Sequence, residues 1–321
     1  MTGWLLAAAG DAVARISPEG IVELALGGSG AQCIAAGDGA IYAGCRSRGV
    51  WKSEDSGRTW DDTGLPQPDV FSVAVGLADG AVYAGCEPSA LFRSDDGGRT
   101  WRELTGLLDI PSRSTWSFPP RPWTSHVRWI APCPHDASLL LVGIELGGLM
   151  RSEDGGETWE DHRPGAKRDV HAIAWHPTVP GSAYEAAGDG TAWSFDGGRT
   201  WRVADDGRDR HYAWALAVDP DDPSTWFCSA STGPYAAHGR GDAQAALYRK
   251  RGEGPWERLG PLLTSMPYAL CFADGRLLAG FADGTLSASE DRGETWQPLP
   301  LAGEPLPRVL ALAAGSPSPD A

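Results

Sequence analysis

The stretch SEDSGRTW, residues 53–60, recurs along the chain with its serine, aspartate, glycine, threonine and tryptophan in the same places. The tryptophans that end the copies are separated by 41, 58, 42, 55 and 40 residues, so the repeating unit has about 40 residues and two units carry insertions. This period is typical of one blade of a β-propeller. The copies are SEDSGRTW at 53–60, SDDGGRTW at 94–101, SEDGGETW at 152–159, SFDGGRTW at 194–201, SEDRGETW at 289–296 and a decayed RKRGEGPW at 249–256.

Each complete copy is predicted to form a tight turn between two strands. The aspartate side chain accepts backbone N–H groups across the turn, and the glycine adopts a backbone conformation closed to larger residues. The Thr-Trp pair then begins the next strand. These carboxylates are therefore predicted to be structural, and they belong to Asp55, Asp96, Asp154, Asp196 and Asp291.

The composition excludes several classes of protein. The 42 glycines, 25 prolines and 15 tryptophans suit short strands and tight turns, and they exclude a helical bundle. A formal net charge of -15 would repel a phosphate backbone, so we expect no nucleic-acid partner. No segment reaches the roughly 18 apolar residues of a spanning helix, and the six cysteines form no CxxC pair. We expect a soluble cytoplasmic monomer with reduced cysteines, no membrane partner and no cofactor.

Seven apolar runs that align without gaps are predicted to be innermost strands. The seventh follows the last turn motif and has no blade of its own, whereas residues 5–26 supply three strands without an innermost one. We therefore predict an all-β, seven-bladed propeller whose first blade is closed by the C-terminal strand. The runs are AQCIAA from Ala31, VFSVAV from Val70, VRWIAP from Val127, VHAIAW from Val170, AWALAV from Ala213, PYALCF from Pro267 and VLALAA from Val309.

The propeller is predicted to be a single domain, residues 1–315, with a disordered tail at 316–321. Two insertions, residues 106–125 and 231–246, are predicted to lie on one face of the ring, because both fall in loops that a four-stranded blade places on that face. Functional sites favour loops on a rigid scaffold, so this face is the candidate functional surface.

The pattern S-x-D-x-G-x-T-W resembles the Asp-box, and the chain resembles the BNR/Asp-box β-propellers of the sialidase-like and WD40/YVTN-like superfamily. That group includes sialidases, some xyloglucanases, sortilin-type receptors and photosystem II assembly factors. The chain lacks the F/Y-R-I-P motif of sialidases, and seven blades are predicted where sialidases use six. Xyloglucanases pair two seven-bladed units, and this chain has one. The resemblance therefore implies the fold and leaves the function open.

The second residue of each innermost run is predicted to face the central channel. These residues are Gln32, Phe71, Arg128, His171, Trp214, Tyr268 and Leu310. Second strands of the blades end on the same face at Arg46, Glu87 and Glu145. Adding the nearby histidines and the insertion's aromatic residues, the predicted ligand-binding residues are Arg46, His126, Arg128, His171, His211, Trp214, Tyr268, Trp116 and Trp123.

Three chemistries fit this cluster. Arginines and His171 would bind an anionic or hydroxyl-rich ligand while Trp214 and Tyr268 stack on its apolar face. A catalytic set of Glu145, Glu87, His171 and Arg128 would act on a glycosidic bond or in a lyase reaction. His126, His171 and His211 would hold a metal together with Glu145, but their spacing matches no metal motif, so no metal is predicted.

The favoured function is binding of a polar small molecule, a glycan or a peptide in the central funnel. The alternatives are a glycoside hydrolase-like or lyase enzyme that uses the catalytic set, and an assembly or scaffold factor for a protein complex.

Overall fold

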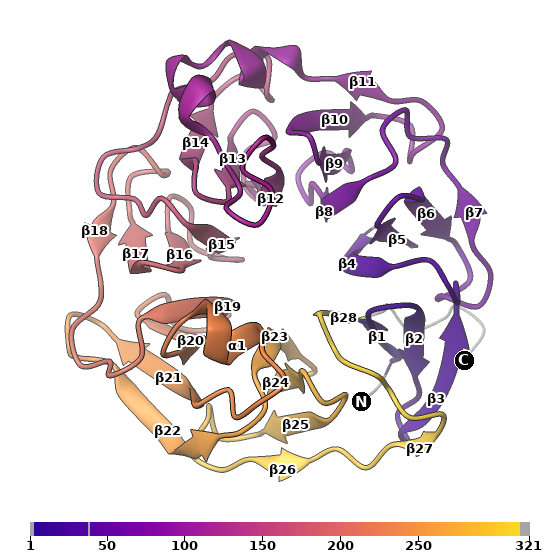
Figure 1. Cartoon of the computed structure of the whole chain (residues 1–321), viewed down its shortest axis with the longest axis vertical. Helices are drawn as coiled ribbons and strands as arrows, with labels where there is room; N and C mark the ends of the chain where they lie inside the picture. Colours follow the sequence, from indigo (N-terminus) through magenta and orange to yellow (C-terminus); the bar gives the residue numbers. More distant parts are fainter. Residues whose placement is uncertain (1–2, 38, 315–321) are drawn as a thin grey trace.

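The computed structural model describes residues 3–37 and 39–314, which form seven antiparallel blades around a central axis (Figure 1). The seven-bladed, all-β fold is as predicted. The predicted tail, residues 316–321, lies outside the described residues. Within the described ranges, no helix is long and apolar enough to cross a membrane.

The strands of each blade follow one another from the axis outward. Blades 2 and 3 contain β4 (Ala31–Gly37), β5 (Ala40–Cys45), β6 (Gly49–Ser53), β7 (Asp61–Asp62), then β8 (Val70–Val75), β9 (Val82–Cys86), β10 (Ala90–Ser94), β11 (Arg102–Glu103). Blades 4 and 5 contain β12 (Val127–Pro132), β13 (Leu140–Ile144), β14 (Gly148–Ser152), then β15 (Val170–Trp175), β16 (Ala183–Ala187), β17 (Gly190–Ser194), β18 (Arg202–Val203). Blades 6 and 7 contain β19 (Tyr212–Val218), β20 (Thr225–Ser231), β21 (Ala245–Arg251), β22 (Glu257–Leu263), then β23 (Pro267–Ala273), β24 (Arg276–Phe281), β25 (Leu286–Ser289), β26 (Gln297–Pro298).

Blade 1 joins the two ends of the described chain. Its innermost strand β28 (Ala311–Ala314) pairs with β1 (Leu5–Ala8), and β2 (Val13–Ile16) and β3 (Ile21–Ala25) follow outward. This closure confirms the prediction from the sequence. The structure adds a short strand that was not predicted, β27 (Ala302–Gly303), which runs parallel to β3 at the outer edge.

The first insertion completes blade 4 on its outer side. It forms two 3₁₀ turns, η1 (Thr105–Asp109) and η2 (Pro111–Thr115), beside a blade that has three strands in the described chain. Leu107, Ile110 and Trp116 are buried in one core with Met150. Burial of these apolar side chains holds the insertion against the ring and explains why it is not an open loop.

The five complete turn motifs share one hydrogen-bond pattern. In each, the serine hydroxyl bonds to the aspartate at 2.8 Å and accepts the glycine N–H, while the aspartate accepts the threonine N–H. The bonds from Thr295 lower the pKa of Asp291 to about 2. All five carboxylates are therefore occupied inside their own turns.

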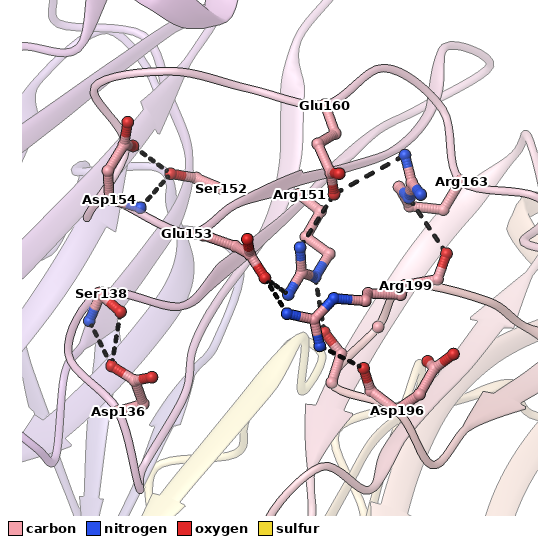
Figure 2. A network of polar contacts seen from close by, with 12 residues as sticks. Asp136, Ser138, Arg151, Ser152, Glu153, Asp154, Glu160, Arg163, Asp196 and Arg199 are labelled. Carbon is pink, nitrogen blue, oxygen red and sulfur yellow. Dashed lines mark hydrogen bonds and ion pairs between the residues drawn. The ribbon is translucent and has the colours of Figure 1, made fainter.

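Buried arginines on the third strands bind the turn of the following blade. Arg151 on β14 donates its Nε–H to the carbonyl of Gly197 at 2.7 Å and pairs with Glu160 at 2.9 Å (Figure 2). The accepting carbonyl belongs to the fourth residue of the motif, and two other blades repeat the contact. The equivalent bonds run from Arg15 to Ser56 and from Arg249 to Arg292, each at 2.8 Å.

At four junctions between blades, a glycine of one second strand faces the valine that begins the next innermost run. A Cβ on Gly143 would lie 2.3 Å from Cγ1 of Val170, so only glycine leaves room for the valine. Between blades 5 and 6 two alanines, Ala186 and Ala213, pack in one core instead. The same glycine–valine contact occurs for Gly44 with Val70, Gly85 with Val127 and Gly280 with Val309.

Replacing Gly143 with alanine should destabilise the protein by about 1–3 kcal/mol, because the added methyl group overlaps Val170. Urea unfolding measures the change. Combining Gly143→Ala with Val170→Ala should cost less than the sum of the two single changes. Gly27, where an added Cβ would meet no atom within 4 Å and whose backbone is not left-handed, is the matched control, and Gly27→Ala should be neutral. Equal losses at Gly27 and Gly143 would contradict the packing argument.

A chain that ends at residue 305 should lose stability by about 3–6 kcal/mol, since it exposes the edge of β1 and removes two buried side chains, Leu306 and Val309. Thermal melting measures the loss. The control ends at residue 315 and should melt with the full chain. A shortened chain with the parental melting temperature would show that ring closure contributes nothing.

Candidate functional site

A cavity of about 820 Å³ lies on the axis of the ring. Its wall includes the second residue of all seven innermost runs, from Gln32 to Leu310. Both insertions also reach it, the first through 118–121 and the second through the short helix α1 (Pro234–His238), which lies near the centre of the ring in Figure 1. The cavity therefore combines the scaffold with its two longest loops.

In six of the seven blades a β-bulge directs the second residue toward the cavity. In blades 2 to 7 the pairing register between the first two strands shifts at this residue, for example between Val170 and Ala172. A bulged residue leaves the hydrogen-bonded ladder and its side chain is re-aimed. His171 in blade 5 and Arg128 in blade 4 owe their place in the wall to this shift.

The polar part of the wall is formed by blades 4 and 5. Glu145 follows β13 and bonds through Oε2 to Nε2 of His126 at 2.8 Å, with Nε of Arg128 at 3.6 Å. Burial would raise the pKa of Glu145, but the bond to His126 and the positive charges nearby lower it to about 2. Glu145 therefore carries a full negative charge at neutral pH.

Asp169 and His171 share this part of the wall. Burial and repulsion from Glu145 raise the pKa of Asp169 to about 7. Burial lowers the pKa of His171 to about 4, so its ring is neutral at pH 7. One ligand atom from each of Glu145, Asp169 and His171 lies within 4.8 Å of the other two.

The part of the wall that blades 6 and 7 form is aromatic and adjoins His171, whose ring centroid lies 4.4 Å from that of Trp214. His238 of α1 lies between two tyrosines: its Nε2 bonds to the hydroxyl of Tyr212 at 2.9 Å and its Nδ1 to the hydroxyl of Tyr268 at 3.0 Å. Trp214 contacts this group, and the guanidinium of Arg128 lies 4.6 Å from the Trp214 ring centroid. A charged group and a flat apolar surface thus stand side by side in the cavity.

Six of the predicted site residues line the cavity: Arg46, Arg128, Glu145, His171, Trp214 and Tyr268. Arg46 is also paired with Asp69 and lies over the ring of Phe71. The described lining does not include the other five, which are Glu87, His126, His211, Trp116 and Trp123.

Glu87 is 7% exposed and forms a bidentate ion pair with Arg121 at 2.7 and 2.6 Å. That pair and the neighbouring His126 lower its pKa to about 2 despite burial. His126 itself is fully buried, stacked on Phe71 with 3.8 Å between ring centroids. The carboxyl group near Glu145 in the cavity wall is therefore that of Asp169, because the Glu87 carboxylate is ion-paired with Arg121.

The remaining three residues lie elsewhere. Trp116 is buried in the core under the first insertion, where Ile110 and Leu107 cover the same blade. Trp123 is 80% exposed, and His211 is exposed beside the buried Tyr212. From the first insertion it is Phe118 that reaches the cavity.

The predicted site residues did not include Asp169, Tyr212 or His238, the last of which lies in the predicted insertion 231–246. Asp169 and Tyr212 each lie two residues before the second residue of their run, His171 and Trp214, and that position was the available signal. His238 is held by the hydrogen bonds of two tyrosines, which only the folded ring brings together.

Known proteins resemble the chain mainly in fold. No family model matches it. A curated relative, vacuolar protein sorting/targeting protein 10 of Emericella nidulans, is 32% identical over 114 residues, which are 35% of this chain and 7% of that protein. This short match covers too little of either chain to assign a family.

Solved structures share the propeller over most of the chain. An ancestral GH74 enzyme superposes with a TM-score of 0.66 at 17% identity, over 83% of this chain and 38% of its own. The GH74 xyloglucanase from Xanthomonas campestris superposes with a TM-score of 0.63 at 19% identity, over 84% of this chain and 45% of its own. The YCF48 protein bound to D1 peptide superposes with a TM-score of 0.59 at 17% identity, over 84% of this chain and 82% of its own. The chain spans less than half of either GH74 enzyme, and these identities show the fold alone.

Removing the Arg121 side chain should cost about 1–3 kcal/mol in the free energy of unfolding, because the buried Glu87 carboxylate loses its bidentate partner. Chemical unfolding at pH 7 measures the loss. Pairing Arg121→Ala with Glu87→Gln should recover part of it, and Arg113→Ala, an exposed arginine of the same insertion, should be neutral. No difference between the Arg113 and Arg121 variants would contradict this role.

Proposed function

We propose that the central cavity binds a short glycan of one to three sugar rings. The observation that carries the proposal is the juxtaposition of Arg128 and Trp214, a cation and a flat ring 4.6 Å apart in the cavity wall. A sugar presents hydroxyl groups for charge-assisted hydrogen bonds on its edge and an apolar face for stacking. The volume, about 820 Å³, lies in the range of small-ligand sites.

In this proposal the polar residues of the wall form hydrogen bonds with the sugar hydroxyl groups, and the aromatic residues stack on the sugar face. Glu145 and Gln32 offer hydrogen-bond groups in the wall, and Tyr212 and Tyr268 extend its aromatic surface. Few polar groups placed in a largely apolar cavity are typical of sites that orient a small ligand. In the same proposal the chain is related to the BNR/Asp-box propellers, on the strength of five turns that share one hydrogen-bond pattern, and acts as a cytoplasmic monomer.

Glycoside hydrolysis is less well supported than binding. Oxygens of Glu145 and Asp169 lie within 4.8 Å of each other. Glycosidases use a pair of free carboxyl groups that flank the scissile bond. Glu87, one member of the predicted pair, is ion-paired to Arg121 instead. Binding without turnover is therefore the function that we propose.

A panel of neutral and acidic di- and trisaccharides, screened by saturation-transfer NMR and followed by calorimetry, tests the proposal. Trp214→Ala and Arg128→Ala should each weaken binding of any hit by at least about tenfold, which corresponds to 1.4 kcal/mol. Trp123→Ala is the matched control, because this tryptophan is 80% exposed and lies outside the described lining.

Three results would overturn the proposal. The first is that no saccharide binds. The second is that short peptides bind through the same residues and saccharides do not. That result would favour peptide binding, as in the YCF48 structure with bound D1 peptide. The third is loss of binding on Trp123→Ala with Trp214→Ala unaffected, which would favour a scaffold that uses its outer surface.

A further inference from the structure

Three side chains with metal-ligating atoms meet in the cavity where blades 4 and 5 adjoin. Glu145 follows the end of β13, Asp169 precedes β15, and the bulge in β15 turns His171 toward them. Nε2 of His171 lies 3.7 Å from Oδ1 of Asp169, and one ligand atom from each of the three residues lies within 4.8 Å of the others. The three ligand atoms are thus near enough to one another to converge on a single ion.

His171 has one ring nitrogen occupied and one available. Its Nδ1 is 2.6 Å from the carbonyl oxygen of Ala213, which can only accept, so Nδ1 carries the proton and Nε2 carries the lone pair. The residue is 1% exposed, and within the described part of the chain Nε2 has no hydrogen-bond partner. A buried polar atom without a partner is costly, and a bound cation would satisfy it.

The hydrogen bonds around the cluster match those of a metal site. Metal-ligating histidines usually donate their second N–H to a carbonyl or a carboxylate, as His171 does to Ala213. A ligating carboxylate is usually hydrogen-bonded in turn, as Glu145 is to the buried His126 at 2.8 Å. His126 is therefore a positioning residue that acts through Glu145.

We propose that Glu145, Asp169 and His171 form a binding site for a divalent transition-metal ion, and that Zn²⁺ is the ion it fits best. One imidazole nitrogen and two carboxylate oxygens are a donor set that zinc accepts. Two carboxylates would balance its charge. With three protein ligands, the fourth position of a tetrahedral ion would face the cavity and remain open to water or to a ligand.

Arg128 opposes the ion and makes the proposal testable. Its Nε is 3.6 Å from Glu145, so its charge lies beside the site while its guanidinium rests over Trp214. Removing this positive charge should strengthen metal binding, whereas the proposed glycan binding should weaken in the same variant. The metal site does not depend on the glycan proposal, and Arg128→Ala separates the failure of one from the failure of the other.

The experiment uses the full chain, freed of metal by chelation. Titration with Zn²⁺ in a calorimeter should give one site per chain, and Co²⁺ should produce the visible absorption of a four-coordinate ion. Bound Zn²⁺ should raise the melting temperature, because it binds the folded state. His171→Gln should abolish the site, Asp169→Asn should weaken it by more than about tenfold, and Arg128→Ala should tighten it.

Exposed His211 supplies the control, and His211→Gln should leave the site intact. Because His171 is buried, each variant is first compared with the parent by circular dichroism, and Asp169→Asn, which keeps the side-chain shape, serves if His171→Gln does not fold. The proposal is wrong if the parent binds neither Zn²⁺ nor Co²⁺. It is equally wrong if binding is lost with His211 and kept without Asp169.

Discussion

The close approach of neighbouring blades is the constraint on which the rest of the structure depends. At four of the junctions a glycine in a second strand leaves room for the valine that opens the next innermost strand, as for Gly143 and Val170. Where the glycine is replaced by Ala186, the facing residue shrinks to Ala213. Van der Waals contact at this distance sets how the blades are spaced around the axis, and the spacing sets the width of the cavity.

Inside that cavity, burial acts differently on groups that lie only a few ångströms apart. Glu145 is bonded to His126 and lies near Arg128, so it stays charged, while Asp169 lacks a comparable partner and is held closer to its neutral form. His171 is neutral for the same reason, since burial disfavours its charge. The cavity therefore brings together a charged carboxylate, Glu145, a neutral imidazole, His171, and a carboxyl group with a pKa of about 7, Asp169.

Much of the fold could be predicted from the sequence, because repeated turns and aligned apolar runs are local signals. The second position of each innermost run was predicted correctly as the lining of the axis, from Gln32 to Leu310. The partners of those residues could not be predicted. That Glu87 is paired with Arg121, that Trp116 is buried, and that His238 joins two tyrosines all depend on how two insertions fold against the ring, for which one sequence carries no periodic signal.

The bulges separate the chemistry of the cavity from the stability of the scaffold. Because a bulged residue stands outside the strand ladder, its side chain can change without breaking the hydrogen bonds that hold its blade. Six such positions, one in each of blades 2 to 7, thus form with Leu310 a circular set of side chains on a fixed frame. Substitutions at these seven positions alone would give many different cavity linings on the same fold. The ligand could therefore change in evolution through few substitutions.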